Sequence, residues 1–350
     1  MGRGRFEEQG AKLSLMVPTF QSAETIERTL KSALAQTYRP LEVVVYDEQS
    51  RDGTREIVSR LLSAADPTIE TRFMTSDTNS GAVPAWRVLL HEITGDWCCF
   101  VWADDVLKPD FTIRMMGGAR RASDAGRVLV GCSAEVETDG RLLPYYATDR
   151  GVLTAVEYSE GMFLRRIPLT QICATYETEA ARAVFDRHID IDNPRGYDYI
   201  RHPYGNDVGF LSDLAGVGRG VVLIGDRLVT NVLSSSSMTR HALREHVWQH
   251  RWQYTFNQLR VWRWWRTDAV QDADRLCAMA ERRLDLCSLM LGGDGSRRRP
   301  SSYSNAVRAY IEFRHFDYQV RHSTREEFRK ATRLSQYEAR GVVGQEGDPS

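Results

Sequence analysis

The sequence is poor in cysteine, and none of its six cysteines belongs to a Cys-x-x-Cys pair. Cysteines scattered in this way do not build a zinc cluster or a disulfide framework, and they fit a reducing compartment. No apolar segment approaches the ~20 residues that a membrane-spanning helix needs. The first residues lead into acidic side chains rather than into the apolar core of a signal peptide. We therefore expect a cytoplasmic protein without a transmembrane segment.

Net charge is also nearly absent, at −1 for 350 residues, but the two ends of the chain differ in sign. Residues 1–237 hold 26 basic and 33 acidic residues, whereas residues 238–340 hold 20 basic and 12 acidic ones. A basic segment that follows an acidic one suggests an anionic partner for the basic segment. A basic helical face that docks on the acidic half explains the same charges equally well.

Short apolar runs alternate with helical patterns through the first hundred residues. The expected strands lie at 12–17, 41–46, 71–74 and 97–103, and the expected helices between them lie at 22–36, 55–62 and 84–93. This alternation predicts an α/β fold with a mostly parallel sheet and helices on both of its faces. The polar loops after the strands then open on one edge of the sheet, where such sheets bind their ligands.

Two adjacent carboxylates, Asp104 and Asp105, end the most apolar of these strands. Neighbouring carboxylates repel each other unless a cation lies between them or one of them stays protonated. Mg²⁺ and Mn²⁺ prefer oxygen ligands and often share them with substrate phosphates. For an isolated pair, a solvated loop or a cap for the helix after Pro109 is the simpler interpretation.

The second half of the chain shows weaker periodicity. It predicts helices at 109–123, 155–164, 179–185 and 206–215, strands at 128–132, 171–176, 221–224 and 228–233, and a hairpin across 133–144 that turns at Asp139-Gly140. The segment 190–204 is expected to be a loop. Residues 238–292 and 305–339 look helical, with a linker at 292–304, and no internal repeat is present.

Several short motifs follow the predicted strands in a fixed order. They are Pro18-Thr19-Phe20, Asp47 with Asp52-Gly53-Thr54, Asn79-Ser80-Gly81, Gly95-Asp96, Asp104-Asp105 and Asn206-Asp207. Each motif alone is weak, but the ordered set resembles the family 2 glycosyltransferases with the nucleotide-sugar-binding GT-A fold. The resemblance covers the first 240 residues, about two thirds of the chain.

This resemblance implies an inverting transfer of a sugar from a nucleotide-diphosphate donor, with a UDP-sugar expected, and a divalent cation, Mn²⁺ or Mg²⁺, as cofactor. It also implies a GT-A catalytic domain over 12–237, after a disordered lead over 1–11. The remaining chain is expected to form a basic, Trp/Arg-rich helical extension over 238–340 and a tail over 341–350.

The resemblance assigns the donor site to the strand-end motifs. The implied nucleotide-sugar-binding residues are Pro18, Thr19, Phe20, Asp47, Glu48, Asn79, Gly81, Asp104 and Asp105. Phe20 would stack on the base, and Asp47 would accept a hydrogen bond from it. Asn79 and Gly81 would let the backbone pass close to the nucleotide. A packed core aromatic for Phe20 and a helix-capping turn for 47–54 are the structural alternatives.

Two carboxylates carry the implied chemistry. Asp104 matches the last carboxylate of the family's aspartate-any-aspartate motif and would hold the metal ion against the diphosphate. Asp207 matches the carboxylate of the family's later Glu-Asp pair and would act as general base on the acceptor. An N-cap for the following helix is the alternative for Asn206-Asp207.

The sequence departs from the family pattern at several positions. Trp102 stands where the metal motif has its first aspartate, so one carboxylate is missing there. Asn206 replaces the usual glutamate, and Trp86-Arg87 replace a common Arg-Asn pair. The family's late histidine has no clear match other than His241. These departures put metal affinity and sugar recognition in question, but not the fold.

The extension mixes tryptophan with arginine, as in the segment 261–266. Such a surface can bind nucleic acid or a membrane, form a helical cap, or form a homodimer interface. The acceptor stays open among a glycan, a lipid-linked sugar, a small molecule, a protein and a modified nucleic acid. Two rival functions are a sugar nucleotidyltransferase, which lacks its glycine-rich phosphate loop here, and a nucleotide-sugar-binding protein without transferase activity.

Overall fold

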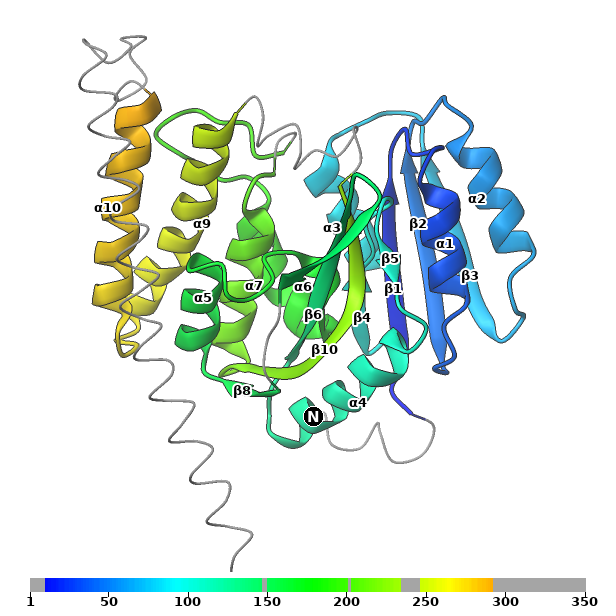
Figure 1. Ribbon diagram of the computed structural model, residues 1–350, viewed down its shortest axis with the longest axis horizontal. Coiled ribbons are helices and arrows are strands. Elements are labelled where there is room, and N and C mark those ends of the chain that lie inside the picture. The colour runs from blue at the N-terminus through cyan, green and yellow to red at the C-terminus, as the bar shows by residue number, and fades with distance from the viewer. Residues whose placement is uncertain (1–9, 147–149, 201–202, 234–245, 292–350) are drawn as a thin grey trace, which may run out of the picture. The chain divides into compact units, whose positions relative to one another are not determined.

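The computed structural model describes residues 10–146, 150–200, 203–233 and 246–291. Its centre is a ten-stranded sheet in the order β3-β2-β1-β4-β9-β6-β10-β5, with β7 paired to β6 and β8 paired to β10 (Figure 1). The strands are β1 (Leu13–Thr19), β2 (Leu41–Glu48), β3 (Ile69–Ser76), β4 (Trp97–Phe100), β5 (Val106–Leu107), β6 (Leu129–Thr138), β7 (Arg141–Tyr146), β8 (Gly151–Leu153), β9 (Ala174–Glu177) and β10 (Val221–Val232).

The parallel sheet expected from the sequence is present from β3 to β4. Beyond β4 the sheet is mixed, because β9 runs antiparallel to both of its neighbours, β4 and β6. The hairpin predicted at Asp139-Gly140 is confirmed as β6 and β7. The two strands expected at 221–224 and 228–233 are one strand, β10, with register shifts between Leu223 and Val229. Gly225-Asp226 therefore marks a bulge rather than a chain reversal.

The helices agree closely with the sequence pattern. They are α1 (Ile26–Leu34), α2 (Thr54–Ser63), α3 (Ala82–Glu92), α4 (Phe111–Asp124), α5 (Ala155–Phe163), α6 (Thr178–Phe185), α7 (Asn206–Val217), α9 (Val247–Thr267) and α10 (Ala273–Leu291). None of the helices in the described part of the chain is long and apolar enough to cross a membrane. The predictions for residues 1–9, 238–245 and 292–350 lie outside the described residues.

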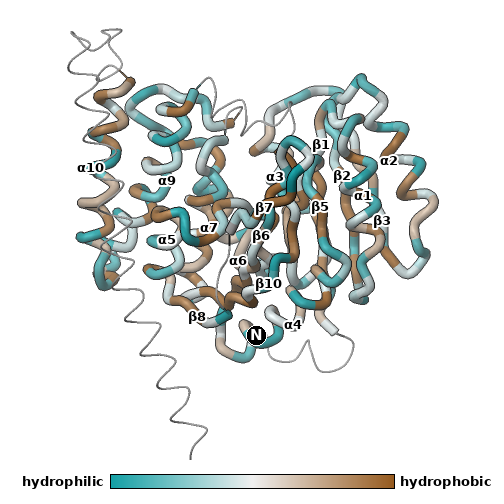
Figure 2. The backbone as a smooth tube through the Cα atoms, in the orientation of Figure 1, coloured by the Kyte–Doolittle hydropathy of each residue, from teal (hydrophilic) through white to brown (hydrophobic). Residues whose placement is uncertain are grey.

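Helices cover both faces of the sheet, as the alternation of strands and helices predicted. Successive residues of β1 point to opposite faces, so Leu15 and Val17 join one hydrophobic cluster and Met16 joins the other. The first cluster includes the apolar sides of α1, α2 and α4, and the second includes those of α3, α6 and α7. Figure 2 shows apolar stretches along the central strands that separate these two clusters.

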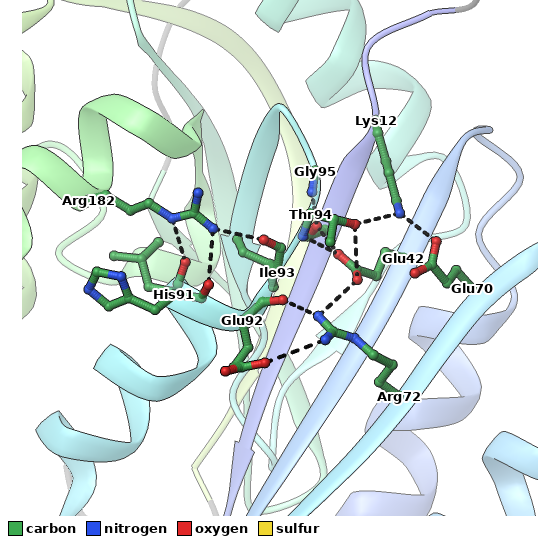
Figure 3. Close-up of polar contacts among 12 residues, drawn as sticks. Lys12, Glu42, Glu70, Arg72, His91, Glu92, Ile93, Thr94, Gly95 and Arg182 are labelled. Atoms are coloured by element: carbon green, nitrogen blue, oxygen red, sulfur yellow. Dashed lines mark hydrogen bonds and ion pairs between the residues drawn. The ribbon is translucent and has the colours of Figure 1, made fainter.

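A network of ion pairs and hydrogen bonds around one buried carboxylate closes the sheet at the amino-terminal ends of β1 and β2, opposite the strand-end loops (Figure 3). The fully buried Glu42 carboxylate accepts hydrogen bonds from Ser14 Oγ at 2.5 Å, from the Thr94 amide at 2.9 Å and from Arg72 at 3.2 Å. A Cβ atom at Gly95 would lie 2.4 Å from Ser14 Oγ. Gly95, one of the motif residues, is thus needed for close packing in the fold and lies away from the strand-end loops.

We predict that Glu42→Ala lowers the free energy of unfolding by about 1–3 kcal/mol, because it leaves the buried Ser14 hydroxyl and the Thr94 amide without their acceptor. Urea denaturation followed by circular dichroism measures this loss. Glu42→Gln is the matched control, since its amide oxygen still accepts two of the hydrogen bonds, and its loss should be smaller. A loss below about 1 kcal/mol for Glu42→Ala would show that the network contributes little.

Helix α9 belongs to the same compact unit as the α/β elements, which spans residues 1–284. The fully buried Trp262 donates its indole N–H to Ser159 Oγ of α5 at 2.8 Å, and Gln258 donates to the Ser159 carbonyl oxygen at 3.0 Å. On the outer side, the Arg251 guanidinium lies 4.9 Å from the ring centre of Trp248. Helix α9 is therefore packed as a helical cap on α5, and the Arg251 guanidinium lies over the indole of Trp248.

Candidate active site

A cleft of about 560 Å³ opens at the carboxyl ends of β1, β2 and β4. It is lined by Pro18, Thr19, Phe20, Gln21, Ser22, Ala23, Glu24, Thr25, Glu48, Asp52, Ala82, Ala85, Trp86, Trp102, Ala103 and Asp104. Five residues predicted for the donor site are therefore brought together there, namely Pro18, Thr19, Phe20, Glu48 and Asp104. Asp47, Asn79, Gly81, Asp105 and Asp207 are not among the described residues that line this cleft.

Phe20 and Asp47 lie at the ends of two neighbouring strands. Phe20 is 49% exposed, so it is not a packed core aromatic. The fully buried Asp47 pairs in register with Thr19, and its Oδ1 accepts hydrogen bonds from the Ser50 amide at 3.1 Å and from Arg55 at 2.5 Å. Asp47 Oδ2 and Thr19 Oγ1 are buried and have no hydrogen-bond partner. Buried polar atoms without a partner are uncommon and mark a place where a polar ligand can bind.

Asp52 supports the turn that follows β2. Its carboxylate accepts hydrogen bonds from the Ala23 amide at 3.0 Å and from Thr54 Oγ1 at 2.6 Å. Partial burial raises the pKa of Asp52, but these hydrogen bonds outweigh that effect, so the pKa lies below its usual range. Gly53 is the N-cap of α2 and has a positive φ of 94°. In the turn expected over 47–54, Asp52 thus binds the Thr54 amide at 3.2 Å, but the N-cap itself is Gly53, without a side-chain capping bond.

Glu48 and Gly81 position the loops around the cleft. The buried Glu48 carboxylate accepts hydrogen bonds from the Ser80 amide at 3.2 Å and from Ser80 Oγ at 2.8 Å, while Asn79 Oδ1 accepts one from the Gly81 amide at 3.0 Å. Gly81 has a φ of 105°, and a Cβ atom on it would lie 2.9 Å from the Ile200 carbonyl oxygen. The close approach that Gly81 permits in this structure is thus with the 190–204 loop.

The adjacent carboxylates Asp104 and Asp105 have different surroundings. Asp105 is buried, accepts hydrogen bonds from the Val232 amide and from Asn231 Nδ2 at 2.8 Å each, and so fixes β10 to the turn after β4. Burial raises the pKa of Asp105 well above its usual range, and the neighbouring Asp104 carboxylate raises it further. Asp104 lines the cleft, and burial raises its pKa to about 6. Its carboxylate has no hydrogen bond to another residue of the described chain.

Among the strand-end carboxylates that line the cleft, Asp104 fits a divalent cation, because neither of its oxygens accepts a hydrogen bond from another described residue, whereas Glu48 binds Ser80 through Oε1. The described residues contain no group of three or more His, Cys, Asp or Glu side chains that could hold a metal by themselves. Mg²⁺ is commonly held by one or two carboxylates together with substrate phosphates and water. A half-buried carboxylate that is free on the cleft side supplies that donor set.

Trp102 and Trp86 lie next to each other at the cleft. In the sequence, these two residues stood out only because they replace other residues of the family motifs. The Trp102 ring stacks on Phe100, with centroids 5.5 Å apart and planes 11° apart, and lies 5.1 Å from Trp86. Trp102 Nε1 donates a hydrogen bond to Thr170 Oγ1 at 2.9 Å. Three contacts therefore hold the indole of Trp102 in one orientation.

Asp207 lies in the first turn of α7. The N-cap of this helix is Gly205, so Asp207 is not its capping residue, although its Oδ1 accepts a hydrogen bond from the Val208 amide at 2.9 Å. Burial raises the pKa of Asp207 to about 7. Asn206 is buried and donates to the His188 carbonyl oxygen at 2.7 Å. A Cβ atom on Gly205 would lie 2.6 Å from Tyr254 Cα, so α9 contacts the backbone directly before Asp207.

Comparisons with known proteins agree with this fold and with the motif order. Residues 14–175 match the model of the family "Glycosyl transferase family 2". The succinoglycan biosynthesis protein ExoO of Rhizobium meliloti (strain 1021) is 34% identical over 136 residues, which are 39% of this chain and 37% of ExoO. The match thus spans well under half of that relative's length.

Two solved structures share the fold over most of the chain. The crystal structure of S. aureus TarS 1–349 in complex with UDP-GlcNAc has a TM-score of 0.55 at 16% identity and covers 91% of this chain and 92% of TarS 1–349. The mannosyltransferase PcManGT from Pyrobaculum calidifontis, in complex with GDP-Man and Mn²⁺, has a TM-score of 0.51 at 16% identity and covers 89% and 86%. Through residues 14–175 the chain belongs to the family 2 glycosyltransferases, and its α/β domain has the GT-A fold.

Proposed function

We propose that this protein transfers a sugar, with inversion, from a UDP-sugar to an acceptor hydroxyl. The observation that carries the proposal is the free Asp104 carboxylate, which faces the same cleft as the exposed Phe20 ring. An aromatic face suits a nucleotide base, and a carboxylate that can bind a cation suits a diphosphate. TarS was solved with UDP-GlcNAc and PcManGT with GDP-Man and Mn²⁺, so proteins of this fold bind nucleotide-sugars.

The residues at the ends of β1 and β2 would hold the nucleoside. Phe20 would stack on the base, and the partnerless Asp47 Oδ2 and Thr19 Oγ1 would meet its polar edge. Arg55 Nε lies 2.5 Å from Asp47 Oδ1, so the Arg55 guanidinium balances the charge of the buried Asp47 carboxylate before a ligand binds.

Asp104 would hold Mn²⁺ or Mg²⁺ together with the donor's diphosphate. When bound, the cation supplies positive charge that stabilises the departing nucleoside diphosphate. Asp105 does not share this role, because both of its carboxylate oxygens accept hydrogen bonds from β10. Asp105 instead keeps the turn that carries Asp104 in place.

Asp207 would take the proton from the acceptor hydroxyl. The acceptor oxygen forms a bond to the anomeric carbon, the bond from that carbon to the diphosphate oxygen breaks, and the proton moves to the Asp207 carboxylate. A general base works best when its pKa lies near the working pH, and burial raises the pKa of Asp207 to about 7.

This proposal predicts that kcat/KM for the acceptor rises with pH, reaches half of its plateau near pH 7 and levels off above about pH 8. The raised pKa of Asp207 means that the carboxylate is increasingly protonated, and so inactive as a base, below pH 7. One pH unit below that pKa, the rate should be about tenfold lower than the plateau. Initial rates at saturating Mn²⁺ between pH 5.5 and 8.5 give the profile. A flat profile would argue against Asp207 as the base.

The donor assignment is tested by thermal unfolding with a set of nucleotide-sugars. In the presence of Mn²⁺, UDP-sugars should raise Tm more than GDP- or dTDP-sugars, because the ligand with the lowest Kd stabilises the folded protein most. A ligand at 100 times its Kd stabilises the folded protein by about 2.7 kcal/mol. Removal of Mn²⁺ with EDTA should abolish most of that shift. A larger shift with GDP- or dTDP-sugars would overturn the choice of uridine, and no shift with any nucleotide-sugar would overturn the proposed function.

A further inference from the structure

One wall of the cleft is apolar and aromatic, which the diphosphate and the base do not explain. It consists of Ala82, Ala85, Trp86, Trp102 and Ala103, whereas the rest of the lining is mostly polar. The three alanines have short side chains, and Trp102 is partly exposed beside them, so its indole is the main aromatic surface of this wall. Phe20, the other aromatic of the lining, lies at the end of β1.

Trp102 is held rigidly enough to serve as a binding surface. It stacks on Phe100, lies 5.1 Å from Trp86 and donates a hydrogen bond to Thr170 Oγ1 at 2.9 Å. Trp86 is in turn buried, with 7% of its surface exposed. An aromatic side chain that is fixed before binding loses little conformational freedom when a ligand packs against it.

We propose that the wall formed by Trp86 and Trp102 binds the C–H face of the donor's sugar ring, and that Trp102 makes the enzyme specific for neutral pyranoses. This inference rests on the proposed function, because it assumes that Asp104 marks the position of the diphosphate. Trp102 precedes Asp104 by two residues, so a group attached to the diphosphate lies within reach of the indole. With Phe20 taken by the base, the sugar is the remaining part of the donor that has an apolar face.

The chemistry of the wall decides which sugars it accepts. An indole offers its ring face to C–H groups, but it cannot accept hydrogen bonds from sugar hydroxyls as a carboxylate would. Apolar contact discriminates weakly between ligands of similar shape, so neutral hexose donors should bind with similar affinities. A uronic acid would bring its carboxylate against two indoles, and an unpaired charge is costly to bury.

The test compares the nucleotide alone with the nucleotide-sugar. Isothermal titration with Mn²⁺ gives Kd for UDP and for UDP-glucose in the wild type, Trp102→Phe and Trp102→Leu. Trp102→Leu should weaken the binding of UDP-glucose about 5–10-fold, because contact with an aromatic face contributes roughly this factor in affinity beyond the burial of apolar area. The same substitution should change the Kd of UDP less than twofold. Trp102→Phe, which keeps a ring, should retain most of the affinity. Phe20→Ala is the control, since it should weaken both ligands by the same factor.

The outcomes separate this inference from the proposed function. If Trp102→Leu keeps the wild-type ratio of the two Kd values, the sugar does not bind to this wall. If UDP-glucuronic acid binds the wild type as tightly as UDP-glucose, the specificity for neutral sugars is wrong. If the wild type binds neither UDP nor any nucleotide-sugar, the proposed function itself fails. If Trp102→Leu does not unfold cooperatively, Trp102→Met replaces it in the same comparison, because it also removes the indole and keeps a long apolar side chain.

Discussion

Asp207→Asn should slow sugar transfer at least about a hundredfold while the fold and the donor affinity stay unchanged. The asparagine keeps the size of the side chain and can still accept the hydrogen bond from the Val208 amide. It cannot take a proton from the acceptor. Because Gly205 is the N-cap of α7, no capping interaction is lost in this variant. Initial rates with saturating donor, together with the Kd for UDP, measure the two quantities separately.

Asp213→Asn is the matched control for this experiment. Asp213 lies on the same helix, and its carboxylate is 3.1 Å from Nε2 of the buried His188. Its loss should lower stability but leave transfer within about tenfold of the wild type, since it takes no part in the proposed proton transfer. Near-normal transfer by Asp207→Asn would exclude Asp207 as the base, and the search would move to the carboxylates of the 190–204 loop.

Asp104→Asn should abolish the Mn²⁺-dependent part of donor binding, with a loss of at least about tenfold in affinity for UDP-sugars in the presence of the metal. The amide oxygen is a neutral and much weaker ligand for a hard cation than a carboxylate. Because the Asp104 carboxylate has no hydrogen bond to another described residue, this substitution should leave the free energy of unfolding nearly unchanged.

Asp105→Ala gives the opposite pattern and serves as the comparison. It removes the acceptor for the Val232 amide and for Asn231 Nδ2, so it should lower the free energy of unfolding by about 1–3 kcal/mol. Titration of Mn²⁺ against UDP binding, and urea denaturation of both variants, distinguish the two neighbouring carboxylates. Unchanged, metal-independent turnover by Asp104→Asn would contradict the assignment of Asp104 as a metal ligand.

The parallel part of the sheet follows from local patterns in the sequence, and the strand order beyond β4 does not. The runs that became β1, β2 and β4 are apolar because both faces of the sheet are covered, and this pattern is readable without knowledge of their neighbours. The antiparallel insertion of β9 depends instead on the pairing of Cys98 with Tyr176 and of Gly131 with Ala174. Such pairings join distant segments, and neither composition nor periodicity reveals them.

The candidate site divides in the same way. Phe20, Glu48 and Asp104 could be assigned to the donor site because the resemblance to the family places it in the loops after predicted strands, and parallel strands bring their carboxyl ends together. The contact of Gly81 with Ile200 could not be predicted, because it joins a strand-end loop to a loop more than a hundred residues later. The two tryptophans of the cleft were visible only as exceptions to motifs, so their grouping required the structure.

The contact between Gly205 and Tyr254 sets a limit on how this protein can be recombined with its relatives. The segment that matches the family model ends at residue 175, before Asp207, and a Cβ atom on Gly205 would collide with the backbone of α9. A chimera that exchanges residues 14–175 ends inside β9, and its new residues must also fit β10, which pairs with β6 and donates hydrogen bonds to Asp105. A chimera that exchanges the segment around Asp207 must carry α9 with it, because the two backbones are fitted to each other.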